Sequence, residues 1–149
     1  MEEKKTKRFR SGFFIFLNTA LIQWFSKKKY TIETSVCGAE FVAMHIIIET
    51  LQGIRYKLKM TGVPISSPSY IYGDNMSIIH NNQRCESTLK KKSNYIYYHA
   101  VCESVTMGES LTGHVGTNDN CAELATKVLY GGKCRFHVSN LVYDIYDDL

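Results

Sequence analysis

The hydrophobic residues near the start of the chain follow the pattern of two short β-strands. The β-prone runs Phe13–Leu17 and Ala20–Phe25 are separated only by Asn18-Thr19. Two polar residues between two such runs favour a tight turn, so we predict an antiparallel hairpin. From Val36 to Met60 the apolar residues instead recur every three or four positions, which is the spacing of one buried helix face. A long helix is therefore predicted there, ending at Gly62-Val63-Pro64.

The second half of the chain alternates between these two periods. The predicted elements are a strand over 69–73, a short helix over 76–82, a long helix over 88–107, a strand over 109–115 and a helix over 121–129 that Gly131-Gly132 closes. A hairpin followed by alternating helices and strands is typical of an α/β fold with a mixed sheet.

Asp74 follows the predicted strand over 69–73 directly, in Gly73-Asp74-Asn75. Two interpretations are open for this carboxylate. It caps the helix that follows, because Asp and Asn accept hydrogen bonds from first-turn amides, and the local sequence favours this role. Alternatively it is a metal ligand at the carboxyl edge of a sheet, where ligands bind in open α/β folds.

The size and composition of the chain suit a single globular domain. It has 149 residues, of which 44% are hydrophobic and 21% charged. We predict a disordered basic lead-in over 1–10, the folded domain over 11–130 and a C-terminal tail over 131–149, with an acidic and aromatic end.

The basic residues are clustered. The formal net charge is +4, and lysines and arginines concentrate in Lys4–Arg10, Lys27–Lys29 and Lys90–Lys92. Such clusters suit a polyanionic partner, although solvated lysine faces are the commoner explanation.

The cysteine pattern indicates reduced thiols. The five cysteines are odd in number and form no CxxC pair, which argues against a disulfide framework and favours an intracellular protein, cytoplasmic or nuclear. Cys134 and His137 have the spacing of half a zinc site, but no second close pair completes it.

Lys4–Arg10 and the apolar run Phe13–Phe25 together imitate a signal peptide. The run is too short to cross a bilayer and is broken by Asn18, Thr19 and Gln23. We therefore predict neither export nor a membrane partner.

Several phrases of the sequence carry a family resemblance when taken in order. They are Ser11-Gly12-Phe13-Phe14-Ile15-Phe16-Leu17, Ile22-Gln23-Trp24-Phe25-Ser26-Lys27-Lys28, Glu33-Thr34-Ser35, Ala39-Glu40-Phe41-Val42-Ala43, Tyr72-Gly73-Asp74-Asn75, Leu89-Lys90-Lys91-Lys92, Tyr98-His99 and Asn120-Cys121-Ala122-Glu123-Leu124-Ala125-Thr126-Lys127. In this order they resemble the ribonuclease H domain at the end of copia-type retrotransposon polyproteins, over about residues 8–130.

The resemblance implies a ribonuclease H-like mixed sheet flanked by helices and a specific chemistry. Acidic residues of that family hold two Mg²⁺ ions, about 4 Å apart, for cleavage of the RNA strand of an RNA–DNA hybrid. Carried over by motif, these acids are Glu40, Asp74 and Glu123. The phosphate contacts to the hybrid would come from two lysine clusters: Lys27, Lys28 and Lys29, and Lys90, Lys91 and Lys92.

The chain also departs from the family pattern. The family's first acid and first strand have no counterpart here, and Glu123 stands where the family usually has Asp. The basic-His phrase that usually opens the second long helix is Lys92-Ser93, while His114 resembles the proton-handling histidine before the last acid. We therefore expect a fragment that lacks the first strand and does not cleave hybrids alone. The alternative is a non-catalytic nucleic-acid-binding remnant.

Overall fold

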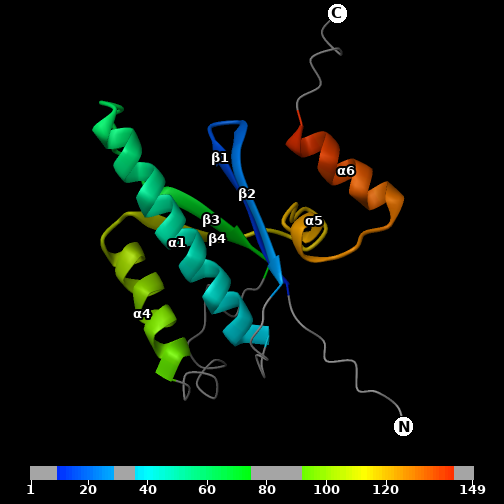
Figure 1. Cartoon of the computed structure of the whole chain (residues 1–149), viewed down its shortest axis with the longest axis horizontal. Helices are drawn as coiled ribbons and strands as arrows, with labels where there is room; N and C mark the ends of the chain where they lie inside the picture. The colour runs from blue at the N-terminus through cyan, green and yellow to red at the C-terminus, as the bar shows by residue number, and fades with distance from the viewer. Residues whose placement is uncertain (1–9, 29–35, 75–91, 143–149) are drawn as a thin grey trace, which may run out of the picture. The chain divides into compact units, whose positions relative to one another are not determined.

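The chain divides into two compact units. The computed structural model describes residues 10–28, 36–74 and 92–142 (Figure 1). Unit 1 combines residues 1–32 with residues 118–149, and unit 2 is residues 33–117. The predicted lead-in over 1–9, the short helix over 76–82, the start of the helix predicted from Thr88 and the acidic end of the chain lie outside the described residues.

Unit 1 begins with the predicted hairpin. Strand β1 (Arg10–Leu17) pairs antiparallel with β2 (Ala20–Lys28), which confirms the prediction. At the turn Asn18 has a φ of 55°, and Asn tolerates this left-handed conformation better than most residues. Phe13 and Phe25 stack across the two strands with ring centroids 5.0 Å apart.

A short helix, α5 (Glu123–Thr126), packs against this hairpin. The Ser26 hydroxyl donates a hydrogen bond to the Ala125 carbonyl at 2.6 Å. Ahead of the helix, the Asn120 side chain accepts one from the Ala122 amide at 3.1 Å. This bond lies in the turn before the helix, whose own N-cap residue, Ala122, makes no side-chain capping hydrogen bond, and the helix is shorter than the predicted 121–129.

The residues predicted as a tail contain a helix, α6 (Gly131–Leu141). The sequence predicts that Gly131-Gly132 ends a helix, and this prediction is wrong, because these glycines form the first turn of α6. The extended Tyr130 precedes them, and its carbonyl accepts the Cys134 amide at 3.0 Å. First-turn amides have no partner within a helix, so glycine costs less there than in a helix interior.

Unit 2 starts with the long helix α1 (Val36–Met60), as predicted. Its end is fixed by Gly62, whose φ of 83° suits a residue without a Cβ atom. The Gly62 amide donates to the Lys59 carbonyl at 3.0 Å, and the Val63 amide donates to the Leu58 carbonyl at 3.0 Å. These bonds satisfy carbonyls of the last turn and turn the chain back along the helix.

The two later strands of unit 2 are parallel. Strand β3 (Ser69–Gly73) pairs with β4 (Ser110–His114) in a register that sets Gly73 opposite His114. In the described residues the strands form two separate two-stranded sheets, one antiparallel and one parallel. The α/β class is confirmed, and a ribonuclease H-like arrangement of one mixed sheet stays a prediction.

The core of unit 2 lies between these strands and two helices. Ile71 of β3 packs with Ile48 of α1 and Val101 of α4 (Lys92–Thr106), and all three are buried. Figure 1 shows α1 and α4 side by side. Tyr70 and Tyr72, one position away from Ile71 on either side, point to the opposite face of β3 and are exposed. In the described ranges no helix is long and apolar enough to cross a membrane.

Candidate functional site

Asp74 and His114 lie at the same edge of the parallel pair. Gly73 is opposite His114, and the Val115 amide donates to the Gly73 carbonyl at 2.9 Å, so both strands reach their carboxyl ends together. Asp74 is the next residue after Gly73 and is half-buried, while His114 is exposed. The structure thus brings together two of the residues that the sequence singles out. Capping by Asp74 is untested, because residues 75–91 are not described.

The backbone of Glu40 lies at the same end of unit 2. The Arg55 guanidinium donates to the Ser67 carbonyl at 2.8 Å and to the Ser69 hydroxyl at 3.2 Å, which ties the start of β3 to the later half of α1. Strand β3 therefore runs back toward the start of α1. Asp74 lies about 10 Å beyond Ile71 along a strand, and Glu40 lies about 12 Å before Ile48 along a helix. The Glu40 side chain is outside the described part.

The third predicted acid, Glu123, belongs to unit 1 and is already paired. It is 5% exposed. Its Oε1 lies 3.1 Å from the Lys127 ammonium, and its Oε2 is in close contact with the Lys133 ammonium of α6. The contact between Lys133 and the Glu123 Oε2 does not have the geometry of a hydrogen bond, but the two charged groups are close enough to form an ion pair. Both carboxylate oxygens therefore face a positive charge.

These lysines lower the pKa of the Glu123 carboxyl below its ordinary value. The contact with Lys133 is the largest cause, and Lys127 acts in the same direction, while burial opposes both by disfavouring the charged form. Glu123 is consequently held as a carboxylate by the protein's own ammonium groups.

The described lysines of the predicted phosphate-binding set lie at the open end of the hairpin. Lys27 and Lys28 end β2, and both are exposed. Lys29, Lys90 and Lys91 lie outside the described residues, as does the side chain of Lys92, whose backbone begins α4.

The structure adds Trp24 to this basic surface and places Arg10, the last residue of the basic cluster Lys4–Arg10, beside Lys28. Arg10 is opposite Lys28 in the register, is exposed, and donates to the Ser26 hydroxyl at 3.3 Å. Trp24 is 69% exposed and lies on the same strand as Lys28. Proteins that bind single-stranded nucleic acids combine basic side chains, which contact the phosphates, with exposed aromatic rings, which stack on the bases. Trp24, Ser26 and Lys28 alternate with other residues along β2, and this spacing is the signal in the sequence that they share one face.

The structure does not support a zinc site at Cys134 and His137. Both lie on α6, and the described residues contain no group of three histidine, cysteine or acidic side chains that is able to hold a metal ion. Cys102, Cys121 and Cys134 are free thiols. Burial raises the pKa of the Cys121 thiol, which makes it less reactive than an ordinary cysteine.

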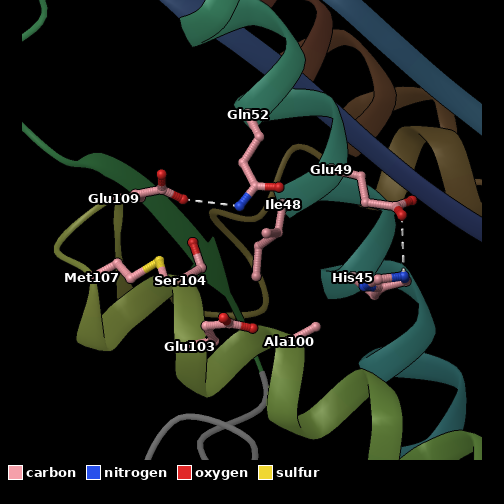
Figure 2. Close-up of a pocket in the computed structure, with 9 residues that line it drawn as sticks. All are labelled: His45, Ile48, Glu49, Gln52, Ala100, Glu103, Ser104, Met107 and Glu109. Atoms are coloured by element: carbon pink, nitrogen blue, oxygen red, sulfur yellow. Dashed lines mark hydrogen bonds and ion pairs between the residues drawn. The ribbon is translucent and has the colours of Figure 1, made fainter.

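A cavity of about 260 Å³ lies between α1 and α4 in unit 2. The Gln52 amide donates to the Glu109 carboxylate at 2.9 Å, and the His45 Nε2 lies 3.4 Å from the Glu49 carboxylate (Figure 2). Glu109 precedes β4, and its carbonyl accepts the Ser69 amide, so the cavity lies at the amino ends of the parallel strands. It is therefore separate from the edge that carries Asp74.

The magnesium site that the resemblance implies stays a prediction, because the Glu40 side chain lies outside the described part and Asp74 and Glu123 belong to different units. Magnesium requires several oxygen ligands with ordered waters between them. Asp74 is available at the strand edge, but both oxygens of Glu123 are occupied by lysines, and no group of three candidate ligands exists in the described part of the chain. The motif gives Glu123 the role of a metal ligand, whereas its surroundings in unit 1 are those of an ion pair.

The chain is similar to retrotransposon polyproteins. It is 29% identical over 119 residues to the retrovirus-related Pol polyprotein from transposon RE2 of Arabidopsis thaliana, and 28% identical over 119 residues to that from transposon RE1 of the same plant. Each match covers 80% of this chain and 8% of the polyprotein. No family model matches the chain, and no solved structure matches it. The similarity supports an origin in a retrotransposon Pol polyprotein.

Proposed function

We propose that this chain is a retroelement-derived ribonuclease H-like domain that does not cleave RNA–DNA hybrids by itself. The observation that carries the proposal is the parallel pairing of β3 with β4. It sets Asp74 beside the end of β4 at a carboxyl edge, where α/β folds bind ligands. The similarity to Pol polyproteins supports the retroelement origin of the domain.

The proposed lack of cleavage follows from the charges around the acids. Hydrolysis with two metal ions needs carboxylates that converge on both ions. In unit 1, Glu123 is neutralised by Lys127 and Lys133, so its carboxylate is not free to join such a set. Asp74 and Glu40 alone provide too few ligands for two ions.

A cleavage assay tests this proposal. Purified protein is incubated with Mg²⁺ and an RNA–DNA hybrid labelled on its RNA strand. We expect the wild type to release no more product than the Asp74→Asn variant, because the ligand set is incomplete. Asp119→Asn, which removes an exposed carboxylate, is the matched control. Cleavage that is robust in the wild type and in Asp119→Asn, and lost in Asp74→Asn, contradicts the proposed inactivity.

A second candidate function, binding of nucleic acid without cleavage, is favoured by the hairpin of unit 1. Arg10, Lys27 and Lys28 are exposed at its open end, and Trp24 exposes most of its ring. The ammonium and guanidinium groups suit phosphates, and the indole suits an unpaired base. Of the lysines that the sequence predicts as phosphate contacts, Lys27 and Lys28 thus share a strand with an exposed aromatic side chain.

Binding by the hairpin is measurable through its own fluorescence, because Trp24 is the only tryptophan of the chain. Titration with a hybrid or a single-stranded oligonucleotide is expected to quench Trp24, with an affinity that falls as salt rises. A double change of Arg10→Gln and Lys28→Gln is expected to reduce the salt slope by about 2. The matched control changes Lys57 and Lys59 of α1, both exposed, to Gln. No binding at low salt contradicts this function.

A further inference from the structure

Glu123 is held by two lysines from different parts of unit 1. Lys127 lies one turn after Glu123, and its side chain is 61% exposed. Lys133 comes from the first turn of α6, and its side chain is only 17% exposed. The Glu123 carboxylate between them is nearly inaccessible to solvent. The more buried contact thus joins two helices, α5 and α6.

We infer that Glu123 is an internal anchor that fastens α6 to α5 through Lys133, and that it is not a ligand for a divalent cation. The inference goes beyond the proposed function, because it concerns the folding of unit 1 and holds whether or not the chain binds nucleic acid.

The orientation of α6 agrees with this role. His137 lies one turn after Lys133 on the same face of α6, and its ring is fully buried. Lys133 and His137 therefore mark the inward face of the helix. Without the carboxylate partner, the half-buried Lys133 ammonium loses its ion pair, which is costly in a poorly solvated environment.

A metal ion would have to compete with both ammonium groups. Mg²⁺ keeps several of its waters when it binds a protein, so it needs an open carboxylate. Glu123 has neither an open face nor a free oxygen, since Lys127 and Lys133 face both. The misfit between this acid and the metal role that the resemblance implies is the basis of the inference.

The two roles predict opposite effects of Glu123→Gln on the metal-free protein. In a metal site without its metal, carboxylates repel one another, so neutralising one of them leaves stability unchanged or raises it. In an ion pair, neutralising the carboxylate leaves Lys127 and Lys133 without their partner and lowers stability. The sign of the change in Tm therefore distinguishes the roles without any measurement of activity.

The experiment compares Tm values in EDTA at pH 7. Glu123→Gln is expected to lower Tm by about 5 °C or more. Glu103→Gln, which removes an exposed carboxylate from α4, is the matched control and is expected to shift Tm little. An unchanged or raised Tm for Glu123→Gln overturns the inference.

The pH dependence of this difference provides a second measurement. The folded-state pKa of Glu123 is lowered, so its stabilisation is fully present above the ordinary value of 4.5 and is lost as the pH falls through the lower folded-state pKa. The charged groups that face it are Lys127 and Lys133, with His137 on the same face of α6. The Tm gap between wild type and Glu123→Gln should thus close only below pH 4.5. A gap that is equally large well below this pH overturns the ion-pair role.

Lysine variants locate the anchor and keep the inference testable if Glu123→Gln does not fold. Lys133→Met is expected to lower Tm more than Lys127→Met, because Lys133 is the less exposed partner. An equal or larger effect of Lys127→Met overturns the role of Lys133. A stabilisation by Mg²⁺ that is present in the wild type and lost in Glu123→Gln, where it can be measured, overturns the exclusion of Glu123 from metal binding.

Discussion

Replacing Ile71 with alanine is expected to cost about 2–5 kcal/mol of unfolding free energy, the largest effect of any single substitution proposed for this chain. Ile71 is 5% exposed and packs against Ile48 of α1 and Val101 of α4. Removing its branched side chain leaves a cavity that the two helices are unable to fill, since each is held by other contacts. Urea or thermal unfolding measures the loss.

Two graded controls accompany Ile71→Ala. Ile71→Val removes one methylene and is expected to cost about 0.5–1.5 kcal/mol. Tyr70→Ala removes a side chain from the exposed face of the same strand, where little burial is lost. A loss in Ile71→Ala no larger than that in Tyr70→Ala contradicts the core described here. Because Asp74 follows Ile71 by three residues on the same segment, loosening of β3 also disturbs the proposed site.

The second large effect is expected at Gly12, where alanine should destabilise unit 1 by about 1–3 kcal/mol. An added Cβ would overlap the Ala125 side chain and would lie 3.0 Å from the Ala125 backbone carbon and oxygen. The obstacle is the backbone of α5, which the Ser26 hydrogen bond holds in place. Relief therefore requires α5 to move away from β1.

Gly53 in α1 provides the control of opposite sign. A Cβ added there meets no atom within 4 Å, so Gly53→Ala is expected to raise stability by about 0.5–1 kcal/mol. In addition, Ala125→Gly introduced together with Gly12→Ala should recover part of the loss, because it removes the closest contact. Equal effects of Gly12→Ala and Gly53→Ala contradict the close approach of β1 and α5.

The contrast between α6 and α1 shows what the sequence was able to predict. The regular apolar spacing of α1 extends over 25 residues, so a periodic pattern identifies both of its ends. Helix α6 has only 11 residues and begins with two glycines, which usually indicate an end rather than a start. The ion pair of its Lys133 with Glu123 depends on how two helices pack, and no periodic pattern in the sequence predicts it.

The residues of the candidate site also differ in how far the sequence predicts their roles. Asp74 was predictable as the residue at the end of a strand, because a β-prone run that stops at Gly-Asp-Asn is a local signal. The pairing of Glu123 with two lysines was not predictable from the sequence. The spacing of a motif indicates which residue occupies a position, but it does not indicate which charges surround that residue. Arg10 joins the basic surface through its register with Lys28, 18 positions later.

The sequence by itself determined the hairpin, the helix over 36–60 and the strand that ends before Asp74, because each depends on neighbouring residues, and it determined the polyprotein resemblance through the order of short phrases. Only the tertiary structure decided the parallel pairing of β3 with β4, the close approach of Gly12 to Ala125 and the anchoring of α6 through Glu123. The first two join segments far apart in the chain and the third joins two successive helices, and packing and charge pairing between separate elements leave no periodic trace in the sequence.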